Sequence, residues 1–63
     1  MMNGKVIRTD ADLTNCIYFD TRVEVWMNGG FEEEVIIADY DDITIKIVGG
    51  GKFLRQNVIL KVA

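Results

Sequence analysis

The 63-residue sequence contains no histidine, no serine and no proline, and it has a single cysteine, Cys16. Without serine or histidine, the Ser-His and Cys-His pairs of nucleophilic catalysis cannot form within one chain. A single cysteine also excludes an internal disulfide and leaves a structural zinc ion without enough ligands. Cys16 lies in the apolar segment CIYF, which predicts a buried structural thiol. We therefore expect no enzyme, no cofactor and no metal site.

Long apolar runs are lacking as well. No stretch approaches the ~20 apolar residues that cross a membrane, and the first residues lack the apolar centre of a signal peptide. The formal charge of −3 and the pI near 4.6 argue against nonspecific binding to nucleic acids or anionic membranes. We expect a cytoplasmic protein with a reduced thiol and no membrane partner.

The composition is 49% hydrophobic, although the chain is short. A chain of this length buries about 60% of its unfolded surface and is marginally stable alone. Small domains are usually stabilised by disulfides, by a metal or by oligomerisation. Because the first two are excluded, we expect residues 1–63 to form one domain that relies on a compact apolar core, on self-association, or on both.

The central region, residues 22–48, has the pattern of three strands. Segments 22–27 (RVEVWM) and 43–48 (ITIKIV) alternate in side-chain character, which is typical of half-buried strands. The segment 33–40 (EEVIIADY) holds a continuous apolar run, which predicts a strand buried on both faces or one that bends between two layers. Asn28-Gly29-Gly30 predicts a hairpin turn, and Asp41-Asp42 is a weaker turn signal.

The flanking segments are shorter. Residues 5–8 (KVIR) are a candidate strand, residues 9–15 can hold a single helical turn capped by Thr9 or Asp10, and residues 16–19 read as a plug or short strand. A glycine turn at 49–51 precedes short strands at 52–55 (KFLR) and 58–62 (VILKV). These patterns predict an all-β fold, a small, strongly bent, five-stranded antiparallel barrel with a short N-terminal arm. The predicted core comprises Val23, Val25, Met27, Val35, Ile37, Ile43, Ile45, Ile47, Leu54, Val58 and Leu60.

Trp26 is the first candidate interaction residue. Alternation places it on the face opposite Val23 and Val25, where it either meets a partner or is covered by the N-terminal arm through Ile17 or Phe19. Tryptophan is enriched at interaction hot spots. A surplus apolar face would add Ile36, Val48 and Ile59. The first hypothesis is therefore a non-enzymatic module that forms homo-oligomers through strand edges or these residues and binds an unknown protein partner, as an accessory or phage-type regulator does.

Two acidic groups have alternative interpretations. Asp39, Asp41 and Asp42 are oxygen ligands suited to a hard cation, but the spacing of a calcium loop is absent, so we predict a solvated turn. The run Glu32–Glu34 either faces a partner or protects a sheet edge from pairing with other chains, and we predict protection.

A second functional hypothesis concerns RNA. In a bent barrel the turn at Tyr40 and the turn at 55–57 come close, so that Tyr40, Arg55 and Asn57, with Lys52 nearby, would stack on and hydrogen-bond a base. The alternative is ordinary turn chemistry, with Arg55 in a surface ion pair. The negative net charge favours this alternative.

From Arg22 to Ala63, the order of segments resembles the Sm-like small barrel of the Sm, Lsm and Hfq proteins. The matching segments are VEVWM, EEVIIADYDD, ITIKI, KFLR and VILKV; glycine-containing or acidic turns separate the first four, and Gln56-Asn57 separates the last two. The resemblance implies a ring whose inner loops bind RNA, with Asp39 ending the second strand, Tyr40 in the base-stacking loop, and Arg55 and Asn57 in the last loop. An SH3-like barrel, with Val6 and Ile7 in its first strand, fits the same pattern.

The RNA hypothesis predicts a measurable affinity for a short RNA that falls as salt rises, because phosphate contacts release counterions. Replacing Arg55→Ala is expected to abolish this binding, which fluorescence anisotropy of a labelled RNA would measure. Absent or salt-independent binding would remove the hypothesis.

Overall fold

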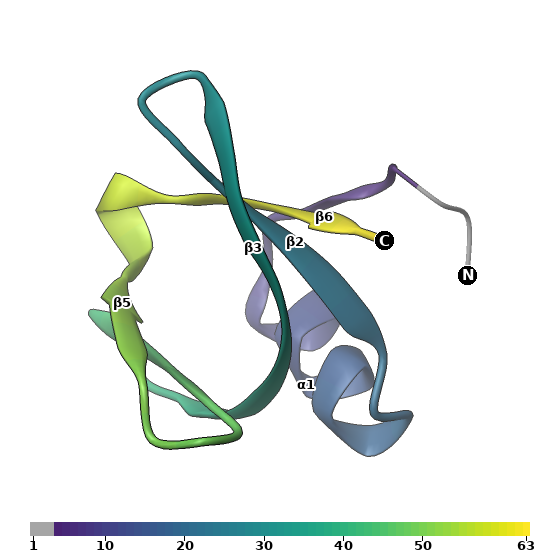
Figure 1. Ribbon diagram of the computed structural model, residues 1–63. Helices are drawn as coiled ribbons and strands as arrows, with labels where there is room; N and C mark the ends of the chain where they lie inside the picture. The colour runs from purple at the N-terminus through teal and green to yellow at the C-terminus, as the bar shows by residue number, and fades with distance from the viewer. Residues whose placement is uncertain (1–3) are drawn as a thin grey trace.

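The computed structural model describes residues 4–63 as a bent antiparallel sheet with one α-helix (Figure 1). The elements, in chain order, are β1 (Val6–Ile7), α1 (Asp10–Tyr18), β2 (Arg22–Met27), β3 (Gly30–Tyr40), β4 (Thr44–Ile47), β5 (Lys52–Leu54), the 3-10 helix η1 (Arg55–Asn57) and β6 (Ile59–Val62). The order across the sheet is β1-β6-β2-β3-β4-β5, and each neighbouring pair is antiparallel. The small antiparallel β fold is therefore confirmed.

The prediction of a five-stranded barrel is wrong in two respects. The sheet has six strands, because the candidate strand at residues 5–8 forms β1 and adds to the edge of β6, pairing Val6 with Lys61 and Ile7 with Leu60. The sheet is also open, since β1 and β5 lie at opposite ends of the strand order and no ladder among residues 4–63 joins them.

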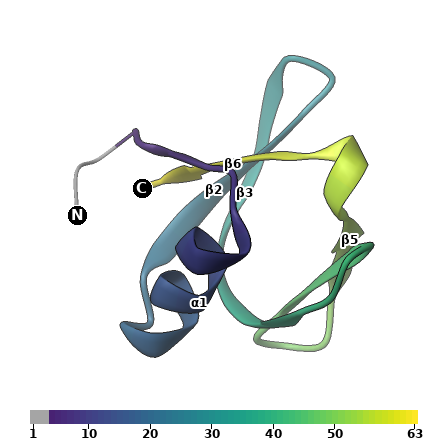
Figure 2. The same ribbon diagram turned by 180° about the vertical axis from the view of Figure 1, so that it is seen from behind.

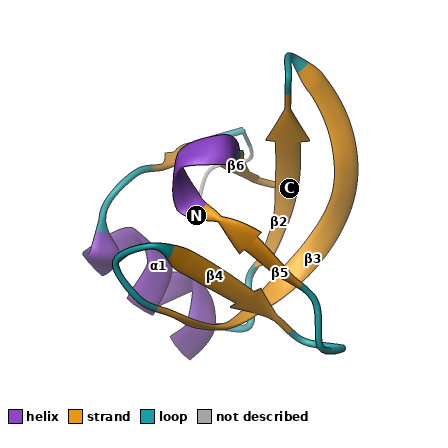
Figure 3. Ribbon diagram, turned by 90° about the vertical axis from the view of Figure 1, so that its left-hand side faces the viewer, coloured by secondary structure: helices purple, strands orange, loops and turns teal. Residues whose placement is uncertain are grey.

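Strand β3 makes the sheet bend, as Figure 3 shows. Its first part pairs with β2 as far as Ile36, and its second part, from Ile37 to Tyr40, pairs with β4. The β3–β4 register shifts between Ile37 and Asp39, which marks a bulge, and bulges increase local bending. The predicted strand that passes from one layer to another is therefore confirmed.

The turn before β3 is the predicted hairpin. Asn28 and Gly29 both adopt positive φ, at 52° and 78°, as a tight hairpin turn requires. Asparagine and glycine are the residues that adopt this conformation at least cost.

The N-terminal arm differs most from expectation. The helix runs for nine residues, so residues 16–18 continue it, Phe19 is its C-cap, and the segment 16–19 is not a strand. Thr9 is the N-cap: its hydroxyl accepts from the Asp12 N–H at 3.1 Å, and the Asp12 carboxylate accepts from the Thr9 N–H at 3.3 Å. Hydrogen bonds from the backbone N–H groups of Arg8 and Thr9 lower the pKa of Asp12. Leu13 and Cys16, three residues apart, are both buried, and this helical spacing explains why the apolar run is not a strand.

The core lies between α1 and the concave side of the sheet, and α1 packs against β3 (Figure 2). Its buried residues are Ile7, Leu13, Cys16, Val23, Val25, Val35, Ile37, Ile45, Leu60 and Val62. The predicted core residues Met27, Ile47 and Val58 are half-buried and pack against it.

Two predictions about the core were wrong. Ile43 is 66% exposed because β4 begins one residue later, and Leu54 is 43% exposed because its neighbour Phe53 is the residue opposite buried Ile45.

The two reciprocal hydrogen bonds between Thr9 and Asp12 form a capping box, and they lead to a prediction about stability. Replacing Thr9→Ala removes the hydroxyl that accepts from the Asp12 N–H and is expected to lower the free energy of unfolding by about 1 kcal/mol. Urea denaturation followed by circular dichroism would measure it. Asn15→Ala, at an exposed position in the middle of the same helix, is the control and should cause no comparable loss. Equal stability of Thr9→Ala and the unchanged chain would show that the cap is not required.

Candidate functional site

An aromatic and aliphatic cluster lies on the outward face of the sheet, near the β2–β3 hairpin, which projects beyond β6 in Figure 1. The strand registers place Trp26 of β2 opposite Ile59 of β6 on one side and Phe31 of β3 on the other. The Trp26 and Phe31 rings meet edge to face, with centroids 5.8 Å apart and planes at 73°. We call Trp26, Phe31 and Ile59 the hairpin cluster.

Charged groups border the hairpin cluster. The Lys61 ammonium lies 4.5 Å from the centroid of the Trp26 ring, a cation–π contact. The indole N–H donates to the Glu24 carboxylate at 3.1 Å. Phe31 and Ile59 remain 52% and 55% exposed, whereas Trp26 is half-buried. The cluster therefore has an apolar centre and a polar border on an accessible face.

The N-terminal arm, which was the alternative cover for Trp26, makes other contacts. Ile17 packs against the core. The Phe19 ring, 69% exposed, stacks on Tyr18 with centroids 4.9 Å apart. The ring contacts of Trp26 among the described residues thus come from the sheet itself.

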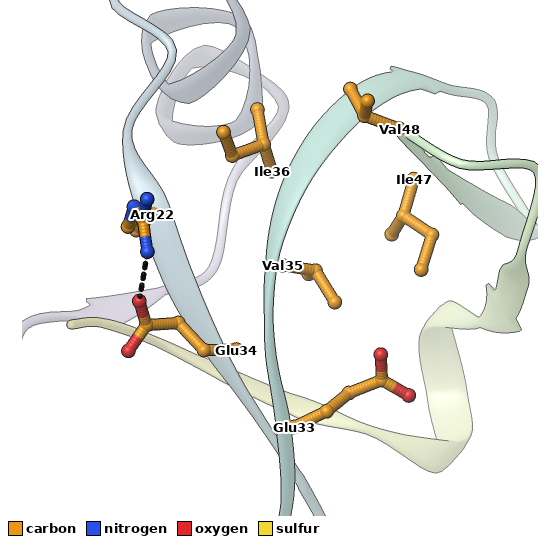
Figure 4. Close-up of a pocket in the computed structure, with 7 residues that line it drawn as sticks. All are labelled: Arg22, Glu33, Glu34, Val35, Ile36, Ile47 and Val48. Carbon is orange, nitrogen blue, oxygen red and sulfur yellow. Dashed lines mark hydrogen bonds and ion pairs between the residues drawn. The ribbon is translucent and has the colours of Figure 1, made fainter.

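Ile36 and Val48 form a second apolar pair where β3 parts from β4. The Val48 N–H donates to the Ile36 carbonyl at 2.9 Å, and Val48 is 62% exposed. Both line an open groove of about 300 Å³ (Figure 4). The other lining residues are Arg22, Glu33, Glu34, Val35 and Ile47. The Arg22 guanidinium pairs with the Glu34 carboxylate at 3.2 Å on one side of this groove.

The four predicted interface residues therefore separate into two pairs. Trp26 and Ile59 are cross-strand neighbours, and Ile36 and Val48 meet at the groove. Along β2 and β3, the charged row Glu24–Glu34 lies between the row Trp26–Phe31 of the hairpin cluster and the row Arg22–Ile36 at the groove.

The structure brings together two of the four predicted RNA-binding residues. The Arg55 guanidinium carbon lies 5.7 Å from the centroid of the Tyr40 ring. Both side chains also contact α1. The Tyr40 hydroxyl donates to the Asp10 carbonyl at 3.1 Å and shares a hydrogen bond with the Thr14 hydroxyl. Arg55 pairs with the Asp10 carboxylate at 2.9 Å and donates to the Asp41 carbonyl at 2.9 Å.

Lys52 and Asn57 are placed apart from this pair. Lys52 lies on β5 opposite Lys46, and Asn57 is the last residue of η1. Within residues 4–63, no side-chain hydrogen bond or ion pair joins either of them to Tyr40 or Arg55. The contacts of Tyr40 and Arg55 fasten α1 to the sheet, which agrees with the alternative interpretation of Arg55 as an ion-pair residue.

The other candidates have structural roles. Cys16 is fully buried, as predicted, and burial raises the pKa of its thiol. The Asp41 carboxylate accepts from the N–H groups of Ile43 at 2.8 Å and Thr44 at 2.7 Å, which lower its pKa and close the predicted turn. In the part of the chain that is described, no three acidic or thiol side chains gather to hold a metal ion.

Sequence reasoning missed Phe31 and Lys61 as neighbours of Trp26. Folding residues 26–31 about the turn at Asn28-Gly29 brings Phe31 beside Trp26, so the signal for Phe31 was present in the sequence. Lys61 comes close to Trp26 only because β2 pairs with β6, and no local sequence pattern predicts that pairing.

Comparisons of the chain with protein-family models, with curated proteins and with solved structures gave no match. A search of the described residues for a helix with the length and apolar character of a membrane span also found none. The candidate site is therefore defined by the geometry of the sheet.

Replacing Tyr40 tests whether its hydrogen bonds hold α1 against the sheet. Tyr40→Phe removes the hydroxyl that bonds Asp10 and Thr14 and is expected to lower the free energy of unfolding by about 1 kcal/mol. Thermal denaturation would measure the loss. Tyr18→Phe is the matched control, because the Tyr18 side chain is 71% exposed. Equal melting temperatures for both variants would contradict a structural role of the Tyr40 hydroxyl.

Proposed function

We propose that this chain is a non-enzymatic cytoplasmic interaction module that associates with copies of itself and binds a protein partner, as small accessory or phage-type regulators do. The observation that carries the proposal is the hairpin cluster, in which an aromatic pair and an isoleucine lie side by side on the outward face of the sheet. Copies meet at this cluster, and their association removes its apolar surface from water.

The chemistry of the cluster supports this role. Centres of protein interfaces are rich in aromatic side chains and poor in charge, with polar residues at the border. Trp26, Phe31 and Ile59 form such a centre, and Glu24 and Lys61 border it. Burial of apolar area is the main favourable term in association, and a short chain has little interior in which to place these side chains.

An SH3-like or Sm-like relationship is part of the proposal. The order β2 to β6, with its long bent second member β3 and the short helix η1 before the last strand, supports such a relationship. The addition of β1 to β6 and the open sheet are departures from a simple barrel. Small barrels of both kinds carry many functions, so the relationship alone selects none of them.

The Sm-like RNA-binding ring is the second candidate. The cation–π contact between Arg55 and Tyr40 favours it, since such a pair is suited to a base. It is the weaker candidate, because Asp10, Thr14 and Asp41 already bind the polar groups of both residues.

The test of self-association is the mass in solution over a range of concentrations, measured by light scattering on a sizing column. We expect the unchanged chain to be heavier than one subunit and Ile59→Lys to dissociate, because a charge enters the apolar contact. Ile43→Lys is the matched control: Ile43 is 66% exposed, compared with 55% for Ile59, and lies in the turn before β4.

The two variants separate the outcomes. Dissociation of Ile59→Lys but not of Ile43→Lys supports the hairpin cluster as the contact. Equal masses for both variants and the unchanged chain, all above one subunit, would move the contact elsewhere. A single-subunit mass at every concentration would reject self-association.

A further inference from the structure

The first half of β3 has a free backbone edge. On one side, β3 pairs with β2 from Gly30 to Ile36. On the other side, β4 pairs with it from Ile37 onward, and the last bond runs from the Val48 N–H to the Ile36 carbonyl. Between Gly30 and Val35, no backbone ladder among the described residues occupies this second side. The groove of Figure 4 lies where β4 leaves β3, and Glu33, Val35 and Ile47 point into it.

Alternation along the strands shows which backbone groups face outward here. The Ala63 N–H donates to the Arg22 carbonyl, so Arg22 faces β6, and its neighbour Val23 faces β3, where it pairs with Val35. Val35 therefore faces β2. Glu34, the residue before Val35, has its N–H and carbonyl on the opposite side, at the free edge of β3.

Strand β5 has a second free edge, on the side away from β4, since among residues 4–63 its only ladder is the one with β4. The Ile47 N–H donates to the Gly51 carbonyl, and the Arg55 N–H donates to the Ile43 carbonyl. Residues 51, 53 and 55 thus face β4, so the N–H and carbonyl groups of Lys52 and Leu54 face away from it.

The two free edges carry opposite charge. Glu32, Glu33 and Glu34 are consecutive and exposed along the β3 edge, whereas Lys52 is exposed on β5 with Lys46 opposite it. Two β3 edges repel each other, and so do two β5 edges, because like charges across a pair of strands are destabilising. A β3 edge and a β5 edge attract.

We propose that β5 of one copy adds as an antiparallel strand to the free edge of β3 in the next copy, with Lys52 opposite Glu34. The proposal rests on the self-association proposed above and names a contact through which it occurs. Glu34, whose backbone groups face outward, can form a hydrogen-bonded pair with either outward-facing residue of β5, Lys52 or Leu54, and the pair with Lys52 brings opposite charges together. The added strand also lies alongside the edge that carries Phe31, so this contact is continuous with the hairpin cluster.

The contact uses different surfaces on the two copies and is therefore heterologous. Each copy keeps one free edge of each kind, so further copies add in the same way. Such contacts close into a ring or extend as a filament. The acidic run protects β3 from other acidic edges and selects a basic strand.

The test is charge reversal on each edge. Lys52→Glu and Glu34→Lys, each alone, are expected to raise the dissociation constant for self-association about tenfold, since an attractive cross-strand pair becomes a repulsive one. Sedimentation velocity at low salt would measure it, and circular dichroism would confirm that each variant is folded. Asp42→Lys, in the turn before β4, is the control for a charge reversal of the same size.

Mixing the two variants is the decisive step. In an equimolar mixture, each β5 edge of one variant meets an oppositely charged β3 edge of the other, so association should return to that of the unchanged chain. An assembly that ignores both reversals, or a mixture that stays dissociated, would overturn the edge contact and leave self-association standing. A single-subunit mass for the unchanged chain at every concentration would reject both proposals.

Discussion

The sheet depends on one strand, β3, which pairs with two partners in succession. Its first part extends the β1-β6-β2 part of the sheet, and its last residues begin the β4-β5 part. Val35 and Ile37, two residues apart, both reach the core although they lie in different ladders, and the bulge between Ile37 and Asp39 lets Tyr40, three residues after Ile37, pack against the same core. The same division leaves half of β3 without β4 beside it, so the bend that closes the core also creates the free edge and the groove.

The helix and the sheet are joined by residues that sequence patterns would assign to ligand binding. Tyr40 is the last residue of β3, and Arg55 is the first residue of η1. An aromatic ring beside a guanidinium is suited to binding a base, but the polar groups of these two side chains bind Asp10, Thr14 and Asp41. Side-chain types near a turn therefore do not by themselves distinguish a binding site from a tertiary contact. The partners of each side chain decide between the two, and two of the three partners here, Asp10 and Thr14, come from α1 and lie 30 and 26 residues before Tyr40.

Local patterns were sufficient for much of the fold. Period-two alternation located β2, and the Asn28-Gly29 turn and the aspartates at 41–42 placed the bends between strands. Patterns failed where a tertiary constraint or a cap decided the outcome. Residues 16–18 are apolar and β-like, yet the capping box at Thr9 and burial of Leu13 with Cys16 continue the helix through them. The hairpin cluster could be predicted only in part: Trp26 and Ile59 were both candidates, but their position side by side, with Lys61 next to them, follows from the long-range pairing of β2 with β6.

The pairing of β6 also bears on how the chain reaches its fold. Strand β6 lies between β1 and β2, so the earliest strand, at Val6, is held by a residue fifty-five positions later, Lys61. Contacts of such sequence separation carry a large loop-closure cost before they return any energy, and they slow folding. During synthesis, the ladders β1–β6 and β2–β6 have no partner until residues 59–62 emerge from the ribosome. Until then Val23 and Val25 lack the strand that covers their edge, and unpaired strand edges with exposed apolar surface favour aggregation.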